Sequence, residues 1–290
     1  MGDRAAAVSD FMTWLALGRV SNLPTVWTNT LAGAVLCGGT NVNSFIAAGL
    51  ALTLFYLGGM FLNDAFDAEF DALHRPSRPI AAGLKSRNVV FSAGFALLAA
   101  GVAVCFCLNA RTGAAAVLLA TAIVLYDWRH KGNALSPFIM GTCRFLSYAV
   151  AGLAVGALTS EASAGGIGLW LYVAGLTFAA RQEAFDGFDN AWPLLLMAVP
   201  PIYAASQAIA SGSAVTLILL AAFVAWSALA LRLLFRRSRG DVPRAVVCLI
   251  AGICLYDATL IAATGRIELA VVAALGCPAT LALQRIAPGT

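Results

Sequence analysis

The sequence predicts an all-α protein, a polytopic transmembrane helical bundle of nine or ten spans, and three observations support this fold class. Hydrophobic residues make up 61% of the 290 residues and charged residues only 11%, against about 25% charged in an average soluble domain. Apolar runs of roughly 20 residues, the length that crosses a hydrocarbon core, fill most of the chain. Lysine and arginine gather in alternate connections between these runs. We therefore expect one integral-membrane domain over residues 1–290, surrounded by membrane lipids and without a nucleic-acid partner.

The N-terminal residues 1–20 are expected to form an amphipathic helix on the membrane surface. Apolar residues of the stretch Ser9–Val20 share one stripe, and Ser9 is a residue type that caps helices. No basic segment leads into a short apolar core with a cleavage site, so no cleaved signal peptide is expected.

The transmembrane bundle is expected over residues 22–284. The predicted spans are 22–39, 43–63, 88–108, 112–127, 136–158, 167–183, 191–210, 213–235, 243–263 and 267–284. Gly276 and Pro278 interrupt the last run, and proline bends or breaks a membrane helix, so the count is nine or ten.

The positive charges predict the orientation of these spans. With a cytoplasmic N-terminus, the odd-numbered connections hold only Arg111 and Arg266. The even-numbered connections hold the others: Arg75, Arg78, Lys85, Arg87, Arg129, Lys131, Arg181, Arg236, Arg237, Arg239 and Arg244. Because lysine and arginine are enriched in cytoplasmic loops, this asymmetry places the polar loops on the cytoplasmic side.

An acidic stretch, NDAFDAEFD at residues 63–71, directly follows the second predicted span. If the helix continues, Asn63, Asp67 and Asp71 lie on one face at i, i+4 and i+8, with Asp64 about 100° away. Carboxylates this close repel one another and need cations, and Mg²⁺ that holds a phosphate is a common solution. The alternative is a solvated acidic loop between helices.

Four stretches on the predicted cytoplasmic side carry matched sets of polar groups, acidic in some and basic in others. They are residues 63–71, 75–78, 126–131 and 181–189. Carboxylates that hold Mg²⁺, together with arginine and lysine that bind the remaining phosphate charge, are what a metal diphosphate requires. Since the apolar spans can house a hydrocarbon tail, the chain has the parts to handle a lipid diphosphate.

The run NDAFDAEFD followed by RPSRPIAAG resembles the first aspartate-rich motif of the UbiA family of intramembrane prenyltransferases, NDxxDxxxD and then RPxRP(I/L)xxG. The spacing matches throughout Asn63 to Gly83. The upstream GRVSNLPTVWTN resembles the family's first-helix entry, with Arg19 and Asn22 at its polar positions. Tyr126 to Lys131 resembles the family's Tyr-x-x-x-x-Lys segment. The resemblance covers residues 18 to 263.

The resemblance implies a UbiA-like helical bundle that transfers a prenyl group from a prenyl diphosphate to a small acceptor, an aromatic compound among the candidates, with Mg²⁺. By position, Asn63, Asp67 and Asp71 would be metal ligands, with Asp64 in support. Arg75, Arg78 and Lys131 would bind the diphosphate. Asp67, Asp71 and Lys131 are thereby also the candidate catalytic residues in this part of the chain.

The second motif differs from the family pattern. Where the family has DxxxD or DxxD near the end of the sixth helix, this chain has RQEAFDGFD. Glu183 stands at the first aspartate position and is the expected metal ligand and catalytic residue, with Asp186 or Asp189 as the second ligand. Glutamate carries an extra methylene, and octahedral Mg²⁺ is strict about ligand geometry.

Further substrate-binding candidates are Arg19, Asn22, Tyr126 and Arg144. Arg144 lies inside a predicted span, where an ionisable group is expensive. It is expected either to reach the headgroup cavity or to extend toward the cytoplasmic end. For Asp257, inside the ninth span, we expect a hydrogen-bonded structural role, and a role at the acceptor site is the alternative.

Two other classes of function fit the same motifs. A membrane terpene cyclase would ionise a prenyl diphosphate and close a ring without an acceptor. A non-catalytic lipid-binding or transport protein would retain the first motif alone. Prenyl chain length, acceptor identity and oligomeric state do not follow from the sequence.

Overall fold

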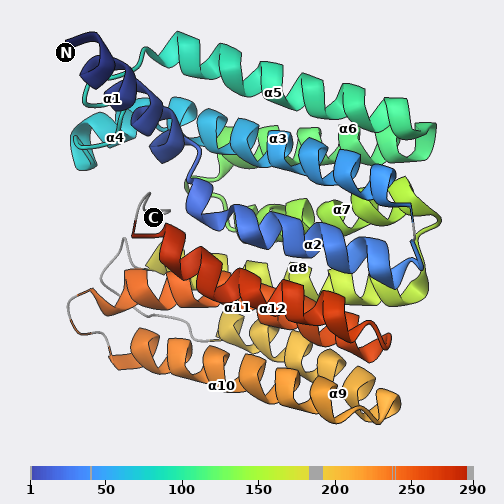
Figure 1. The fold of residues 1–290 in the computed structure, drawn as a ribbon. Helices are drawn as coiled ribbons and strands as arrows, with labels where there is room; N and C mark the ends of the chain where they lie inside the picture. The colour runs from blue at the N-terminus through green and yellow to red at the C-terminus, as the bar shows by residue number, and fades with distance from the viewer. Residues whose placement is uncertain (1, 40, 183–191, 237, 239, 286–290) are drawn as a thin grey trace.

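The computed structural model describes residues 2–39, 41–182, 192–236, 238 and 240–285, and every element of secondary structure in these ranges is a helix. Most of the long helices run antiparallel to the next long helix along the chain (Figure 1). Their bounds are α1 Gly2–Leu17, η1 Val20–Asn22, α2 Leu23–Leu36, α3 Val42–Phe66, α4 Ala68–His74, α5 Arg87–Leu108, α6 Ala110–Arg129, α7 Ser136–Val155, α8 Ser160–Gln182, η3 Trp192–Ala198, α9 Val199–Ser211, α10 Ala214–Arg236, α11 Asp241–Ala263 and α12 Ile267–Leu283. The predicted all-α fold class is confirmed.

The helices form two groups, with α2 and α7 between them. Helices α3, α5 and α6 pack together on one side, and α8 to α12 pack together on the other (Figure 1). Helix α2 contacts α7, α3 and α11, so the first span of the chain joins the two groups. The first group is centred on buried Leu52, Phe55 and Leu119, and the second on buried Tyr172 and Tyr256.

Within the described ranges, eight segments are long and apolar enough to cross a membrane. They cover all the predicted spans except the first and the last. Helix α2 has only 14 residues, and α12 has 17. Helix α12 continues through Pro278, which the sequence suggested as a break. The count of nine or ten spans therefore stays a prediction.

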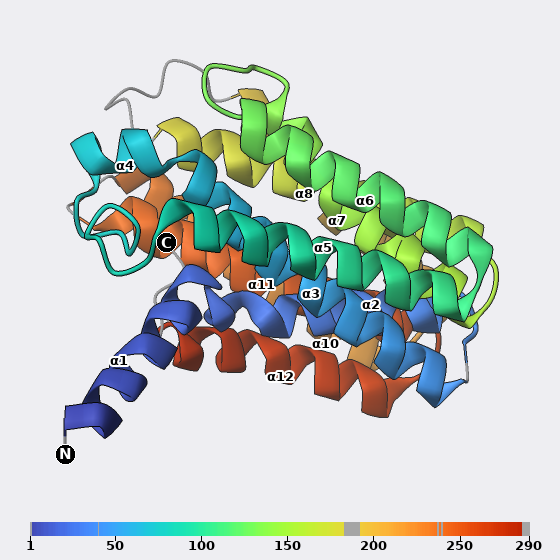
Figure 2. The ribbon, with the colours of Figure 1, turned by 90° about the horizontal axis from the view of Figure 1, so that it is seen from above.

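The N-terminal helix α1 lies within the predicted range 1–20. It begins at Gly2, so Ser9 lies inside α1 and does not cap it, and it ends at Leu17. Figure 2 shows α1 pointing away from the bundle, with only its C-terminal end in contact. There Leu17 is fully buried and the ring of Trp14 lies 5.1 Å from that of Phe61. The location of α1 on the membrane surface stays a prediction.

Small residues allow α2 and α7 to approach closely. A Cβ atom added at Gly33 of α2 would lie 2.8 Å from the carbonyl oxygen of Tyr148 in α7. Any larger residue at this position would push the helices apart. This contact holds in place the polar side chains that project from the same two helices.

Candidate functional site

A cavity of about 990 Å³ lies among the helices and opens beside α4. Its inner wall is apolar, with contributions from Leu52, Phe55, Leu119, Leu176 and Ile253. Its polar side chains include nine residues predicted from sequence: Arg19, Asn22, Asn63, Asp67, Arg75, Arg78, Tyr126, Lys131 and Arg144. The fold therefore brings most of the predicted site to one apolar cavity with a charged mouth.

The acidic stretch keeps its helical register although the helix is interrupted. Helix α3 ends at Phe66 and α4 begins at Ala68, with Asp67 between them. Backbone N–H groups still donate four residues back, from Asp67 to Asn63 and from Asp71 to Asp67, at 3.0 and 2.8 Å. The predicted stacking of Asn63, Asp67 and Asp71 is thus retained in the backbone.

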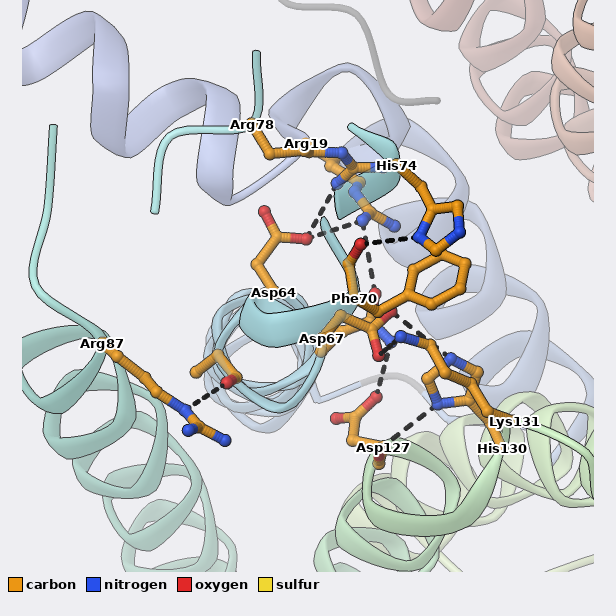
Figure 3. Close-up of polar contacts among 12 residues, drawn as sticks. Arg19, Asp64, Asp67, Phe70, His74, Arg78, Arg87, Asp127, His130 and Lys131 are labelled. Atoms are coloured by element: carbon orange, nitrogen blue, oxygen red, sulfur yellow. Dashed lines mark hydrogen bonds and ion pairs between the residues drawn. The ribbon is translucent and has the colours of Figure 1, made fainter. Parts of the chain in front are cut away.

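Asp67 lies at the cavity mouth beside two basic residues (Figure 3). Its Oδ1 atom is 2.7 Å from Lys131 Nζ, and its Oδ2 atom is 3.4 Å from His130 Nε2. Burial raises the pKa of the Asp67 carboxyl, but the hydrogen bonds and charges of His130 and Lys131 outweigh burial and bring the pKa below its ordinary value. Asp67 is therefore ionised at neutral pH. His130 is not among the residues predicted from sequence to form the site.

The Asp67–Lys131 ion pair makes stability depend on pH. Because the folded-state pKa of Asp67 is lowered, the pair stabilises the fold above the unfolded pKa near 4, and this contribution disappears as pH falls through the folded value. The pair is partly exposed, so we expect Lys131→Met to cost at most about 1 kcal/mol at pH 7. Thermal unfolding in detergent should show this difference at pH 7 and a smaller difference as pH falls below 4. An equal difference at pH 7 and below pH 4 would contradict the assignment, and Lys131→Arg is the charge-preserving control.

Asp64 holds two arginines with one oxygen. Its Oδ1 atom accepts hydrogen bonds from Arg19 and Arg78, each at 2.8 Å, and Asp64 is only 4% exposed (Figure 3). The sequence predicts Asp64 as a metal ligand, whereas the structure places it outside the cavity wall and between guanidinium groups. Burial and the neighbouring Arg19 charge lower the pKa of Arg78. Asp64 therefore compensates two positive charges that would otherwise repel.

Arg19 reaches this cluster from an unusual backbone conformation. Its φ and ψ are 43° and 48°, in the left-handed region that non-glycine residues rarely adopt. Tyr56 Oη donates a hydrogen bond to the Arg19 carbonyl oxygen at 3.0 Å. The strain costs about 1 kcal/mol or more, and persists because contacts on both sides of the residue fix it.

Asp127 is a site residue that sequence reasoning missed. It lies in the last turn of α6, two residues before its end, lines the cavity and is 4% exposed. Its Oδ1 atom accepts a hydrogen bond from Asn63 Nδ2 at 3.1 Å, while its Oδ2 atom has no hydrogen-bond partner among the described residues. This contact orients the Asn63 amide so that Asn63 Oδ1 faces Arg19 Nη2, 3.3 Å away. The sequence feature that could have identified Asp127 is a carboxylate at the end of an apolar span.

Asp71 is buried, and no residue in the described part of the chain donates a hydrogen bond to its Oδ1 atom. It is 3% exposed and is not part of the cavity wall. Burial raises its pKa, against the nearby charge of Arg78 and together with the charges of Asp67 and Asp64. An orphaned carboxylate oxygen of this kind is one that a cation would satisfy.

The donor set at the mouth fits a hard cation that substrate oxygens help to hold. Asn63 and Asp67 provide oxygen atoms at the cavity wall, and the buried Asp71 lies near Asp67; oxygen atoms are the ligands that Mg²⁺ prefers. Among the described residues, no three His, Cys, Asp or Glu side chains lie close enough to hold a metal by themselves. This agrees with Mg²⁺ chemistry, because Mg²⁺ usually takes one or two carboxylates plus phosphate oxygens and water.

The remaining predicted residues have different positions. Asn22 Oδ1 accepts a hydrogen bond from Gln284 Nε2 at 2.9 Å, which ties the first span to the end of α12. The Tyr126 ring stacks on the His130 ring, with centroids 5.2 Å apart. Arg144 lines the cavity, which is one of the two positions predicted for it from sequence. Glu183, Asp186 and Asp189 lie outside the described residues, so their roles stay predictions.

The helical bundle and this site define a class: polytopic membrane proteins with an apolar cavity whose mouth carries carboxylates, arginines and lysine. Residues 25–274 match the UbiA prenyltransferase family. The chain therefore belongs to the UbiA prenyltransferase family.

Two curated relatives are digeranylgeranylglyceryl phosphate synthases. The Methanopyrus kandleri protein is 30% identical over 142 residues, which is 47% of this chain and 52% of that protein. The Ignicoccus hospitalis protein is 35% identical over 122 residues, 42% of this chain and 40% of that protein. The chain thus covers about half or less of each relative's length.

Solved structures share the fold at low sequence identity. A structure of digeranylgeranylglyceryl phosphate synthase has a TM-score of 0.65 at 18% identity, covering 90% of this chain and 99% of that chain. A UbiA homolog from Aeropyrum pernix K1, in its apo form, has a TM-score of 0.64 at 18% identity, covering 82% and 97%. A UbiA homolog from Archaeoglobus fulgidus bound to DMAPP and Mg²⁺ has a TM-score of 0.53 at 15% identity, covering 93% and 98%.

Proposed function

We propose that this protein is a Mg²⁺-dependent prenyltransferase that transfers a prenyl chain from a prenyl diphosphate to an acceptor at the cavity mouth. The observation that carries the proposal is the meeting of ionised Asp67 with Arg75, Arg78 and Lys131 at the opening of an apolar cavity. A diphosphate headgroup matches the charged mouth, and a hydrocarbon tail matches the wall. Family membership and the DMAPP- and Mg²⁺-bound relative support the same assignment.

The basic residues would bind and stabilise the departing diphosphate. Arg75, Arg78 and Lys131 can form charge-assisted hydrogen bonds to phosphate oxygens, the stronger class of hydrogen bond. Asp64 keeps Arg78 directed by accepting its hydrogen bond. Preorganised donors aimed at a developing anion are commonly the largest catalytic contribution. Bound Mg²⁺, held by Asn63, Asp67 and Asp71, would supply further charge for the diphosphate oxygens.

The transfer breaks the allylic C–O bond, and its electron pair leaves with the diphosphate. A bond then forms between the allylic carbon and the acceptor nucleophile, which releases a proton. Apolar and aromatic residues of the wall, among them Phe55 and Phe70, would exclude water from the allylic carbon. Exclusion of water favours transfer over hydrolysis.

The relatives favour a glyceryl phosphate lipid as the acceptor over the aromatic compound considered from sequence, since both curated relatives carry that name. We also propose that the cavity mouth faces the cytoplasm, which the charge distribution of the loops supports. An N-terminal fusion whose accessibility is measured in intact cells tests this orientation.

Purified protein incubated with Mg²⁺, an acceptor and dimethylallyl, geranyl or geranylgeranyl diphosphate is expected to yield a prenylated acceptor, detected by mass spectrometry. Chelation of Mg²⁺ by EDTA should abolish the product, because carboxylates and arginines alone leave the diphosphate charge incompletely neutralised. A cyclised hydrocarbon formed without acceptor would instead support the terpene cyclase. Diphosphate binding without turnover of any donor would support the non-catalytic alternative.

A further inference from the structure

Arg144 is a cation on the cavity wall, well inside the bundle. It lies eight residues after the start of α7 at Ser136, about 12 Å along the helix axis. It is half-buried and lines the cavity. The apolar residues Val173, Leu176 and Ile253 line the same cavity.

Arg144 uses little of its hydrogen-bonding capacity. Its Nη1 atom donates to Asn29 Oδ1 at 2.8 Å, and this is its one hydrogen bond within the described part of the chain, where it also forms no ion pair. A guanidinium group has five N–H donors in a fixed fork. Unused donors on a charged group inside a membrane protein are costly unless a ligand satisfies them.

A fully buried hydrogen-bond network holds in place Asn29, the hydrogen-bond partner of Arg144. Asn29 Nδ2 donates to Asp257 Oδ2 at 2.8 Å, and Tyr148 Oη donates to Asp257 Oδ1. Asn29, Tyr148 and Asp257 are each 0% exposed. Because a carboxylate only accepts and a guanidinium only donates, the Asn29 amide has one possible orientation between them. This confirms the hydrogen-bonded role expected for Asp257.

The amide between Asp257 and Arg144 has a functional consequence. A direct carboxylate pair would occupy the guanidinium fork and neutralise it. With Asn29 in between, Asp257 compensates the charge at a distance, and the rest of the fork stays available to a ligand. The close contact of α2 with α7 at Gly33 keeps this geometry rigid.

From these contacts we infer that Arg144 forms a second anion subsite, which binds the phosphate monoester of a lipid acceptor, while Asn29 and Asp257 are positioning residues. The inference rests on the proposed prenyl transfer. A phosphate monoester suits the planar fork, which binds two of its oxygens at once. It also agrees with the glyceryl phosphate in the names of the curated relatives.

The subsite is separate from the cations assigned to the donor diphosphate. Within the described residues, the direct polar contact of Arg144 is with Asn29, whereas Arg78 bonds to Asp64 and Lys131 pairs with Asp67. Tyr56 lies between the two sites, close to both Arg19 and Arg144. A prenyl diphosphate held at the mouth directs an uncharged tail inward, so an anion at Arg144 belongs to the second substrate.

The test compares dodecylglycerol phosphate with dodecylglycerol, two lipids that differ only in the phosphate, by titration calorimetry on the full-length protein without donor. Wild type should bind the phosphate lipid about 10- to 100-fold more tightly, as expected for hydrogen bonds to a charged group. Arg144→Gln should remove that preference and leave the affinity for geranyl diphosphate with Mg²⁺ unchanged. Asp257→Asn should also weaken phosphate-lipid binding, by a smaller factor than Arg144→Gln. Arg111→Gln is the matched control, because Arg111 is exposed and lies at the end of α6 opposite to the end that carries the cavity residue Asp127.

Retained geranyl diphosphate binding shows that Arg144→Gln is folded. Equal affinity of wild type for both lipids, or no binding of either, overturns the subsite. An equal loss of geranyl diphosphate and phosphate-lipid binding in Arg144→Gln would assign Arg144 to the donor diphosphate, which also overturns it. None of these binding results decides the proposed function, which the prenyl-transfer assay tests separately.

Discussion

Asp67→Asn is expected to lower kcat/KM for prenyl transfer about 10²- to 10³-fold, the loss typical of one electrostatic element aimed at a developing charge. Asparagine has the same size but lacks the charge that Asp67 keeps at neutral pH through its contacts with Lys131 and His130. The concentration of Mg²⁺ that gives half-maximal rate should rise as well, because a carboxylate ligand is lost. Steady-state kinetics over a Mg²⁺ titration measures both effects.

Glu69→Gln is the matched control for this substitution. Glu69 belongs to the same acidic stretch, but its side chain is 85% exposed and pairs with Arg87. It should retain near-normal turnover and Mg²⁺ dependence. Near-normal turnover of Asp67→Asn would overturn both the metal-ligand assignment and the proposed function.

Asp64→Ala is expected to have the second large effect, on donor binding and on stability together. Removal of its carboxylate leaves Arg19 and Arg78 facing each other without their shared acceptor. Breaking a buried pair in this way costs about 3 kcal/mol of unfolding free energy. The KM for the prenyl diphosphate should rise about 10- to 100-fold because Arg78 is no longer directed at the mouth.

The Mg²⁺ titration distinguishes the two roles considered for Asp64. If Asp64 positions arginines, as its contacts indicate, Asp64→Ala changes the donor KM while half-maximal Mg²⁺ stays close to the wild-type value. Asp64→Asn should be intermediate, since an amide oxygen still accepts a hydrogen bond without the charge. A shift in Mg²⁺ dependence as large as that of Asp67→Asn would instead support the metal-ligand role predicted from sequence.

The residues that were predicted from sequence to share a site, and that line the same cavity in the structure, are marked by local features of the sequence, namely their spacing and their position at the end of a predicted span. The spacing of Asn63, Asp67 and Arg78 places them near one end of a span, and the loop that contains Lys131 follows another span. Asp127 and His130 lie in that same loop region, but nothing in their spacing distinguishes them from solvated residues. Their roles became visible only through contacts with Asn63 and Asp67, which are 64 and 63 positions away.

The sequence by itself determined the all-α class, the positions of the apolar helices and the family, because hydrophobic run length and motif spacing are local properties of the chain. Tertiary structure decided which charges meet. Asp64 binds arginines 45 and 14 positions away, and Asn29 joins Asp257 across 228 positions. Such pairings depend on which helices become neighbours and how closely they pack, as α2 and α7 do at Gly33. In the sequence Arg144 is an isolated charge in an apolar span. The packing of the helices places it on the cavity wall, where most of its N–H donors remain available to a ligand.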